Sequence, residues 1–195
     1  MMYTVAWYTD MAQHGPEETR EYYQDLVDLH IPICKSFGTD QGFEVACTGI
    51  QVLGGVGFTR DFPLEQNARD QKIGSIYEGT NGIQALDLLG RKIWQEQSHG
   101  LQLLMQEMQV DLEAATTDRC QQWALSLSET LQQAVKVTQS LGKSLMSEDP
   151  DRVLANASCY LHLFGHIIVS WMWLRQANAA AKALGSANRD EERDF

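Results

Sequence analysis

The stretch GGVGFTRDFPLEQNARDQKIGSIYEGTNGIQ, residues 54–84, interrupts a chain whose apolar residues otherwise repeat at helical spacing. It opens as a loop over residues 54–63, where three glycines and a proline let the backbone approach another molecule closely. A short helix is expected through LEQNARD, followed by a second turn at IYEGT. Asn81 or Thr80 then caps another helix, with Gln84 three residues beyond Asn81 in capping-box position.

The residues before this stretch predict three helices. A helical repeat of apolar residues over residues 1–12 predicts the first helix, which the sequence HGP ends. Pro16 suits the first turn of the second helix, and Pro32 is expected to kink it. A third helix is expected to start at Thr39 or Asp40.

Longer helices are expected after the interruption. The helix that starts near Asn81 should bury one apolar face, and Gly100 marks a boundary to a second helical section. Two stripes follow, the later one close to heptad spacing; Asp149 with Pro150 then starts a helix that runs to Leu184, where Gly185 ends it. The three apolar faces consist of Ile83, Leu86, Leu89 and Ile93; of Leu101, Leu104, Met105, Met108 and Leu112; and of Leu127, Leu131, Ala134, Thr138, Leu141 and Leu145.

These patterns predict an all-α fold, an up-and-down helical bundle followed by a second helical section of long helices. We expect a bundle domain over residues 1–98, an added helical section over residues 99–186, and a charged, disordered tail over residues 187–195. A chain of 195 residues is long enough to bury a sizeable core.

Charge and cysteine content narrow the partners and the compartment. The net charge of -11, from 15 basic and 26 acidic side chains, argues against a nucleic-acid partner, because phosphate backbones are bound by clustered Lys and Arg. The four cysteines are scattered and form no CxxC pair, which favours reduced thiols in the cytoplasm. No basic segment precedes an apolar one at the start, so no signal peptide is expected.

The most apolar run, LHLFGHIIVSWMWL (residues 161–174), is too short and too interrupted by histidine to span a bilayer, and a buried helix is expected there. His162 and His166 lie four residues apart and could share a metal, but no third ligand is evident, so a polar edge on a packed helix and no metal site are predicted. Trp171 and Trp173 are expected in a core or an interface. Arg69 and Asp70 are interpreted as structural charges.

Glu78 is the residue that invites two interpretations. A carboxylate beside Ile76 and Tyr77 is either a solvated residue at a turn or a group tuned for chemistry, because burying its charged form is costly. Single carboxylates are common on surfaces, so the residues alone favour the solvated turn.

A family resemblance changes that balance. The segment QVLGGVGFTRDFPLEQNARDQKIGSIYEGTNGIQALDLLGRKI, residues 51–93, resembles the C-terminal helical domain of acyl-CoA dehydrogenases, since it combines the GGxGF loop, the RD pair and IYEGTxxIQ in that order. The stretch EGTNGIQALDLLGRK looks most like the branch with an added C-terminal helical section, similar to methylthiopropanoyl-CoA dehydrogenase. The resemblance is clear over residues 37–94 and rests on position and helicity after Gly100.

The resemblance implies α,β-dehydrogenation of an acyl-CoA thioester to a trans-2-enoyl-CoA with FAD as cofactor. Glu78 matches the family's catalytic base, with Ile76 and Tyr77 helping to exclude water from it. Tyr77 and Gly79 match substrate-binding positions, and the backbone N–H of Glu78 would polarise the thioester carbonyl.

The flavin contacts carry over in the same way. Gln51, Gly54 and Gly55 match positions that, in relatives, reach the adenosine diphosphate part of a FAD held by the neighbouring subunit. Thr80 matches a position near the flavin of its own subunit. Gly82 departs from the Gln or Glu frequent in the family. A homo-oligomer and an electron-transfer flavoprotein are the implied partners.

Family members also carry an N-terminal helical domain and a central β-barrel domain, which this sequence does not contain. The chain is therefore expected to be a fragment, a truncated gene product or one part of a split enzyme. The alternative to an acyl-CoA dehydrogenase component is a catalytically inactive helical scaffold or oligomerisation domain.

Overall fold

The protein is 88% helical, with no strand among the described residues, so the all-α prediction is confirmed. The computed structural model describes residues 1–147 and 150–186. In chain order the elements are α1 (Met2–His14), α2 (Glu17–Leu53), η1 (Gly54–Phe58), α3 (Leu64–Gly74), α4 (Asn81–Gly90), η2 (Lys92–Ser98), α5 (His99–Glu113), α6 (Asp118–Ser147), α7 (Pro150–Leu154) and α8 (Ala157–Ser186).

Helix α2 is one continuous helix of 37 residues, and the predicted separate helix starting at Thr39 or Asp40 is wrong. Thr39 does not cap a new helix, because its hydroxyl donates backwards to the carbonyls of Lys35 (2.8 Å) and Ser36 (3.1 Å) of the same helix. At about 1.5 Å of rise per residue, α2 is roughly 56 Å long. It is the longest element of the protein and contacts most of the others.

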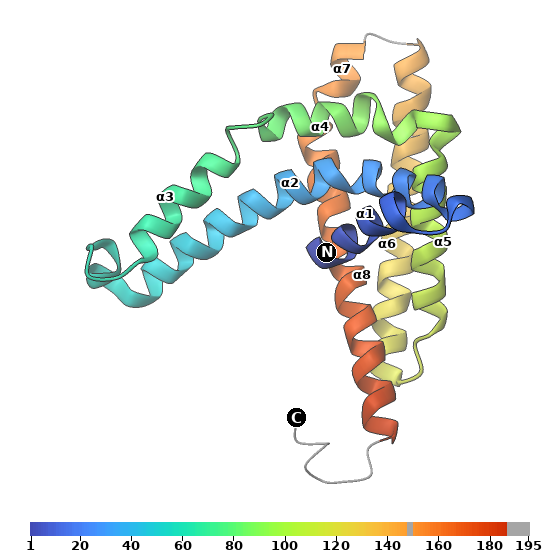
Figure 1. Cartoon of the computed structure of the whole chain (residues 1–195). Helices are drawn as coiled ribbons and strands as arrows, with labels where there is room; N and C mark the ends of the chain where they lie inside the picture. The colour runs from blue at the N-terminus through green and yellow to red at the C-terminus, as the bar shows by residue number, and fades with distance from the viewer. Residues whose placement is uncertain (148–149, 187–195) are drawn as a thin grey trace.

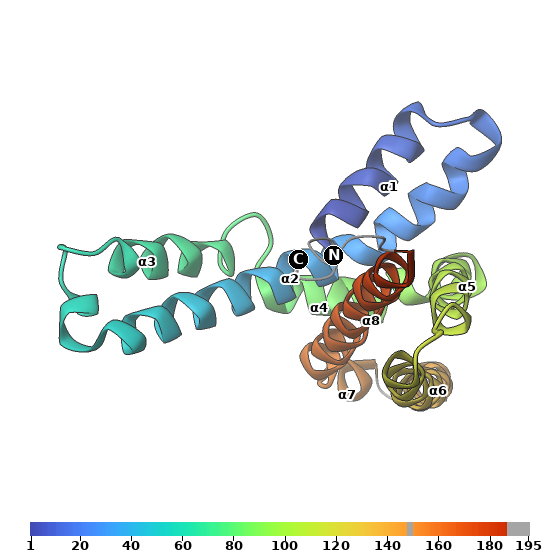
Figure 2. The same cartoon turned by 90° about the horizontal axis from the view of Figure 1, so that it is seen from below.

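The axis of α2 changes direction between the half beside α1 and the half beside α3 (Figure 2). Pro32 lies between these halves and is buried. Proline has no backbone N–H, so one hydrogen bond of the helix is missing there, and its ring displaces the preceding turn. The kink expected at Pro32 is therefore accounted for within an unbroken helix.

The C-terminal half of α2 pairs with α3, and η1 joins them at the tip, so that these elements project from the body as an arm (Figures 1 and 2). Glycines let the two helices approach. A Cβ at Gly42 would lie 2.5 Å from the Gln71 side chain, and one at Gly74 would lie 2.9 Å from Thr39. The predicted loop over residues 54–63 contains the single 3₁₀ segment η1 followed by turns.

Three long helices, α5, α6 and α8, run side by side in the body, and α4 and the N-terminal half of α2 cross them (Figure 1). Helix α8 contacts α2, α4, α5 and α6 and supplies the largest share of the buried side chains. Its core residues are Ala157, Tyr160, Leu161, Phe164, Ile167, Ile168, Trp171, Met172 and Leu174. The stripe predicted on α6 is buried at Leu127, Leu131, Ala134 and Thr138.

The apolar face predicted for α4 is partly wrong. Ile83 and Leu86 are 56% and 47% exposed. The buried residues are Ala85, Leu88 and Leu89. The helical period does not continue to Ile93 because α4 ends at Gly90 and Arg91 leaves helical geometry (φ -136°, ψ -68°).

The two helical sections meet at η2, close to the boundary expected at Gly100. Glu96, Gln97 and Ser98 all have positive φ (46°, 60° and 67°), which reverses the chain before α5. Gly100 itself lies inside α5, where a Cβ would sit 3.2 Å from the carbonyl oxygen of Asp25 on α2. Close packing of α5 on α2, rather than a break, explains this glycine.

The last helix is split, which the sequence did not indicate. Pro150 begins α7, as expected, but Asn156 N–H donates to Val153 in a tighter i→i+3 bond before α8 begins at Ala157. Gly185 does not end α8, which continues to Ser186, because one glycine costs a helix only about 1 kcal/mol. Asp149 and the predicted tail over residues 187–195 lie outside the described residues.

Helix α8 is long and apolar enough over Ala157–Gly185 to cross a bilayer by length and composition, but 56% of its 18-residue apolar window is buried inside the protein. Burial of this kind is found in core helices.

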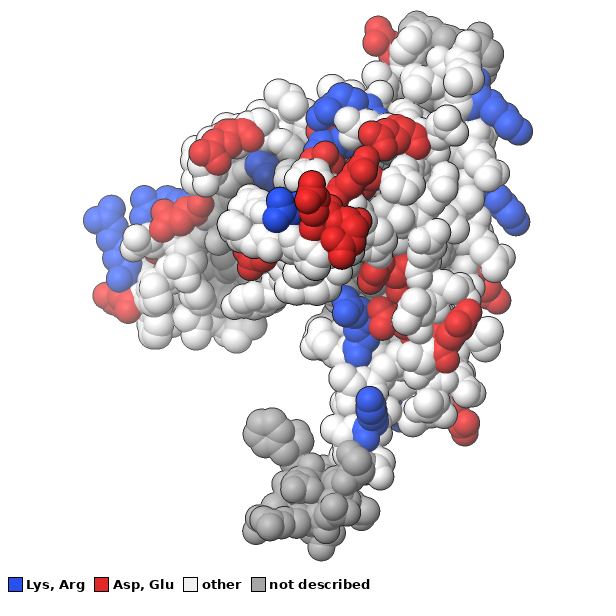
Figure 3. All heavy atoms as spheres, turned by 45° about the vertical axis from the view of Figure 1, so that its right-hand side comes forward, with Lys and Arg blue, Asp and Glu red and all other residues white. Residues whose placement is uncertain are grey.

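Figure 3 shows acidic side chains gathered in the middle of one face, with basic side chains scattered around them.

Trp171 and Trp173 give a matched test of the core. Trp171 is fully buried and its indole N–H donates to the Asp111 carboxylate (2.6 Å), whereas Trp173 is 66% exposed. We expect Trp171→Ala to lower the free energy of unfolding by about 3–5 kcal/mol and Trp173→Ala by less than about 1 kcal/mol. Urea denaturation measures both, and equal losses would contradict the assigned core.

His30 gives the fold a pH dependence. Its ring is buried, Nδ1–H donates to the Leu26 carbonyl (2.7 Å), and Nε2 has no hydrogen-bond partner. Burial lowers the pKa of His30 from 6.5 to about 4. Between about pH 4 and about pH 6.5, His30 is therefore protonated in the unfolded chain but neutral in the folded one. The folded state loses stability as the pH falls from about 6.5 to about 4.

Over that pH range, His30 alone lowers the free energy of unfolding by roughly 3 kcal/mol. We expect His30→Gln, which cannot titrate, to show a shallower decline of the urea midpoint over that pH range than the unmodified chain. His14→Gln, at an exposed position, is the control. Parallel pH curves for the unmodified chain and His30→Gln would show that His30 is not buried neutral.

Candidate functional site

The turn between α3 and α4 carries Glu78 in an uncommon backbone conformation. Glu78 has φ 53° and Gly79 has φ 86°. The turn is closed by the Asn81 N–H, which donates to the Ser75 carbonyl (3.2 Å), and by the Tyr77 N–H, which donates to Ile73 (3.1 Å). A non-glycine residue in the left-handed region costs about 1–2 kcal/mol, so other contacts must hold Glu78 there.

Lys35 on α2 supplies the strongest of these contacts. Its half-buried ammonium donates to the carbonyl oxygen of Gly79 (2.6 Å) and to Oδ1 of Asn81 (3.1 Å). A hydrogen bond from a charged donor contributes about 1.5–3 kcal/mol, which exceeds the cost of the left-handed residue. The Glu78 turn is thus docked on the middle of α2.

Asn81 ties the start of α4 to the same part of α2. Its amide Nδ2 lies within hydrogen-bond distance of Asp40 Oδ1 (2.8 Å), Thr39 Oγ1 (3.1 Å) and the Ser36 carbonyl (3.3 Å). Of the two predicted caps, Thr80 is the N-cap, and the capping box of Asn81 with Gln84 is wrong because Asn81 is the first helical residue. The Asn81 side chain is used between helices, which a local pattern does not reveal.

The surroundings of Glu78 are open. Glu78 and Thr80 are exposed, and Ile76 and Tyr77 are 53% and 52% exposed. The expectation that Ile76 and Tyr77 exclude water from Glu78 is wrong for this chain by itself, because both rest on the outside of the turn. Together with Ile83 on α4, they instead present apolar surface beside the carboxylate.

The glycine-rich segment forms a second exposed surface. Gln51, Gly54 and Gly55 are exposed at the tip of the arm, and a Cβ on either glycine would meet no atom within 4 Å. Gly57 differs, because a Cβ there would lie 2.7 Å from the carbonyl oxygen of Ile50. Gly54 and Gly55 therefore leave backbone open to another molecule, while Gly57 serves the packing of the tip.

The two predicted groups of site residues lie at opposite ends of α3. Figure 1 shows α3 running from the tip of the arm back towards α4. With 11 residues, α3 is roughly 16 Å long. The structure brings Tyr77, Glu78, Gly79 and Thr80 together in one turn, and Gln51, Gly54 and Gly55 together at the tip, but it does not bring the two groups together.

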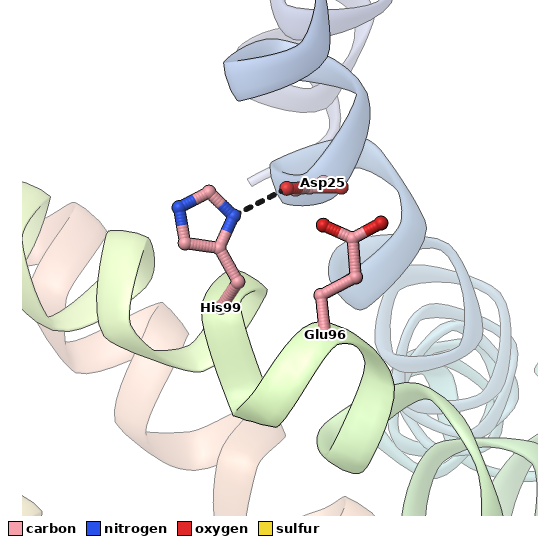
Figure 4. Close-up of side chains that lie close together, drawn as sticks. All are labelled: Asp25, Glu96 and His99. Atoms are coloured by element: carbon pink, nitrogen blue, oxygen red, sulfur yellow. Dashed lines mark hydrogen bonds and ion pairs between the residues drawn. The ribbon is translucent and has the colours of Figure 1, made fainter.

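A group of possible metal ligands joins α2 to α5, and sequence reasoning missed it. The ligand atoms of Asp25, Glu96 and His99 lie within 4.8 Å of one another, the one such group found among residues 1–147 and 150–186. Figure 4 shows Glu96 and His99 facing Asp25, and His99 Nδ1 lies 2.6 Å from Asp25 Oδ2.

This group is explained without a metal. The ammonium of Lys92, 3.4 Å from Asp28, lines the same cavity of about 170 Å³ and offsets the two carboxylates. The hydrogen bond between Asp25 and His99 ties the start of α5 to α2. No local signal predicts it, because 74 residues separate the partners and the turn at Glu96 reverses the chain.

The other residues singled out from the sequence have structural contacts. Arg69 pairs with Glu65 one helical turn away (3.1 Å). His162 Nε2 lies 3.5 Å from Asp40 Oδ2, and the His166 ring meets Phe37 edge-on with centroids 5.1 Å apart. The two histidines therefore contact α2.

A groove of about 730 Å³ runs between α6 and α8. Its walls carry no Asp, Glu, Lys or Arg, and the exposed rings of Trp123 and Trp173 flank it. The sequence did not indicate this groove, because it depends on how α6 and α8 pack against each other and not on the pattern within either helix.

Two family descriptions match the chain. The family "Acyl-CoA dehydrogenase, C-terminal domain" matches residues 1–94, and the family "Acetyl-CoA dehydrogenase C-terminal like" matches residues 104–195. The chain therefore belongs to the acyl-CoA dehydrogenase family, as the resemblance had indicated, and carries its C-terminal helical regions.

Named relatives agree. The chain is 31% identical over 194 residues to 3-methylmercaptopropionyl-CoA dehydrogenase of Ruegeria pomeroyi, covering 96% of this chain and 32% of that protein. It is 32% identical over 174 residues to the broad-specificity linear acyl-CoA dehydrogenase FadE5 of Mycobacterium tuberculosis, covering 86% and 28%. The chain thus spans about a third of the length of the curated relatives it matches.

The fold is shared with a solved structure. The structure of Caenorhabditis elegans ACDH-11, determined in complex with C11-CoA, aligns with a TM-score of 0.71 at 16% identity, over 89% of this chain and 30% of that one. At this identity the likeness concerns the arrangement of helices.

Gly79 and Gly82 test the turn. A Cβ at Gly79 (φ 86°) would be strained and 2.8 Å from Gln84 Nε2, whereas one at Gly82 would meet only Thr80 Oγ1, at 3.9 Å. We expect Gly79→Ala to lower the free energy of unfolding by about 1–2 kcal/mol, and Gly82→Ala, within α4, to raise it by about 0.5–1 kcal/mol. Urea denaturation of both variants measures this, and a loss of stability at Gly82 as large as that at Gly79 would contradict the assigned backbone.

Proposed function

We propose that this chain provides the C-terminal part of a FAD-dependent acyl-CoA dehydrogenase, with Glu78 as the base that removes the proton α to the thioester carbonyl. The observation that carries the proposal is the docked turn. Lys35 holds the turn of the strained, exposed Glu78 by binding two residues that follow it, Gly79 and Asn81. Strain held at an exposed carboxylate is typical of functional sites.

The residues of the turn have distinct parts in the reaction. The Glu78 carboxylate accepts the α-proton, and the Glu78 backbone N–H donates to the thioester carbonyl and stabilises the charge that develops there. Tyr77 and Gly79 border the acyl group. A bound FAD supplies the acceptor for the hydride that leaves the β carbon, and the product is a trans-2-enoyl-CoA. A further domain that covers Ile76 and Ile83 would exclude water from the carboxylate.

The cofactor is proposed to contact both groups of site residues. Gly54 and Gly55 leave open backbone for the phosphates, with Gln51 beside them, and Thr80 lies at the N-terminus of α4, the positive end of the helix dipole. Because α3 separates these groups, a flavin that Thr80 contacts would meet the arm tip of a second copy. The proposal therefore includes a homo-oligomer.

The rest of the enzyme is part of the proposal as well. The relatives are about three times as long as this chain. We propose that regions like their unmatched two thirds complete the substrate tunnel and the flavin pocket. An electron-transfer flavoprotein would reoxidise the flavin. The cytoplasm is the proposed compartment, in keeping with four free cysteines.

A second candidate function is a catalytically inactive scaffold or oligomerisation domain. It is favoured by the apolar residues that the arm exposes, among them Val45 (69%), Val52 (80%), Phe58 (80%) and Ile73 (51%). Surfaces of this kind usually bind another protein surface. They fit an assembled enzyme equally, so catalysis must decide between the two functions.

The test is a fusion of this chain to the regions of the Ruegeria pomeroyi relative that precede the matched third. We expect the fusion to hold flavin and to oxidise an acyl-CoA, and Glu78→Gln to lower kcat by about 100- to 10,000-fold while flavin is retained. Glu44→Gln, an exposed residue of the arm, is the matched control. A folded fusion without turnover, or turnover that survives Glu78→Gln, would refute the proposed base.

A further inference from the structure

We propose that a chain of polar contacts from α8 to α3–α4 positions the Glu78 turn, with Lys35, Asn81, Asp40 and His162 as positioning residues. The role given to Glu78 rests on the proposed function; the contacts themselves do not. His162 lies on α8, Lys35 and Asp40 lie on α2, and Asn81 starts α4.

The contacts are continuous from end to end. His162 Nε2 lies 3.5 Å from one oxygen of Asp40, and the other oxygen of Asp40 accepts from Asn81 Nδ2 (2.8 Å). Oδ1 of Asn81 accepts from the Lys35 ammonium (3.1 Å), which also donates to the carbonyl oxygen of Gly79 (2.6 Å). The last contact reaches the residue next to Glu78.

Charge fixes the orientation of the Asn81 amide. Its oxygen faces an ammonium and its nitrogen faces a carboxylate, so turning the amide over would place donor against donor and acceptor against acceptor. One orientation therefore dominates, and the start of α4 has one position on α2. The polar atoms of Gly79 and Asn81, which follow Glu78 in the turn, are held by this arrangement.

The Glu78 carboxylate has no hydrogen bond among the contacts of the described residues, so its direction depends on the backbone that the chain of contacts holds at φ 53°. Without Lys35, the strongest contact that offsets the strain at Glu78 is lost, and the turn is expected to relax. The contact of His162 with Asp40 also joins the region matched over residues 104–195 to the region matched over 1–94. The added helical section thereby supports the turn that bears the base.

The test uses the whole chain and NMR. The backbone N–H of Asn81, which donates to the Ser75 carbonyl (3.2 Å), reports opening of the turn through its hydrogen exchange. The Cα chemical shift of Glu78 reports its left-handed backbone. We expect Lys35→Met to speed hydrogen exchange at Asn81 roughly tenfold and to move the Glu78 signal, because a charged hydrogen bond is lost. Exchange in the core of α8 should be unchanged, and Lys35→Arg should restore the turn.

Lys72→Met is the control, since Lys72 lies over the Phe43 ring of the arm (5.0 Å) and touches no member of the chain of contacts. His162→Leu should give a smaller change of the same sign, about two- to fivefold, because its contact with Asp40 is longer (3.5 Å) and partly exposed. An unchanged turn in Lys35→Met would overturn the proposal, and an unchanged turn in His162→Leu would remove α8 from it.

The fusion with the relative's preceding regions separates this inference from the proposed function. There we expect Lys35→Met to lower kcat at least tenfold with KM unchanged, since a displaced base slows the chemical step without weakening binding. An inactive parent fusion would refute the proposed function and leave the NMR result standing. An active fusion with the same kcat in Lys35→Met would refute the positioning role alone.

Discussion

The rest of the structure depends on the continuity of α2 through Thr39, whose hydroxyl donates back to the Lys35 carbonyl within the same helix. The N-terminal half of this helix packs with α1 and α5, its middle contacts α8 at Phe37 and Asp40, and its C-terminal half pairs with α3 to form the arm. A break near Thr39 would detach the arm from the body. It would also remove the surface on which the Glu78 turn is docked, because Lys35 and Asp40 lie in the same stretch.

This constraint explains how a small turn keeps an unfavourable backbone. The left-handed conformation of Glu78 costs less than the charged hydrogen bonds of Lys35 contribute, and those bonds are available only while α2 is helical past Asp40. The same rigid helix holds Gly54 and Gly55 far from Glu78. In the proposed enzyme, one chain therefore takes part in two flavin sites, with its turn in one and its arm tip in the other.

Local sequence patterns predicted most of the helices and the two turns that carry the candidate site. The turns follow from glycine and proline, and Glu78 was identified through the order of three motifs. Thr39, Asn81 and Ile83 were misjudged because the packing of the helices, and not the local pattern, decides where these side chains lie. Thr39 bonds within a helix that continues past it, Asn81 bonds to α2 instead of capping α4, and Ile83 lies on an exposed face of α4. The Lys35 contact, 44 residues away, left no local signal.

The most direct test of the central claim, that the turn and the arm tip of one chain serve different sites, is a complementation assay in the fusion. A Glu78→Gln variant and a Gly55→Asp variant, which would repel the flavin phosphates, are each expected to be inactive as separate proteins. After unfolding and refolding as a mixture, the account predicts regained turnover, because a mixed assembly contains sites with an intact Glu78 from one copy and an intact arm tip from the other. A mixture as inactive as its two parents would contradict the account.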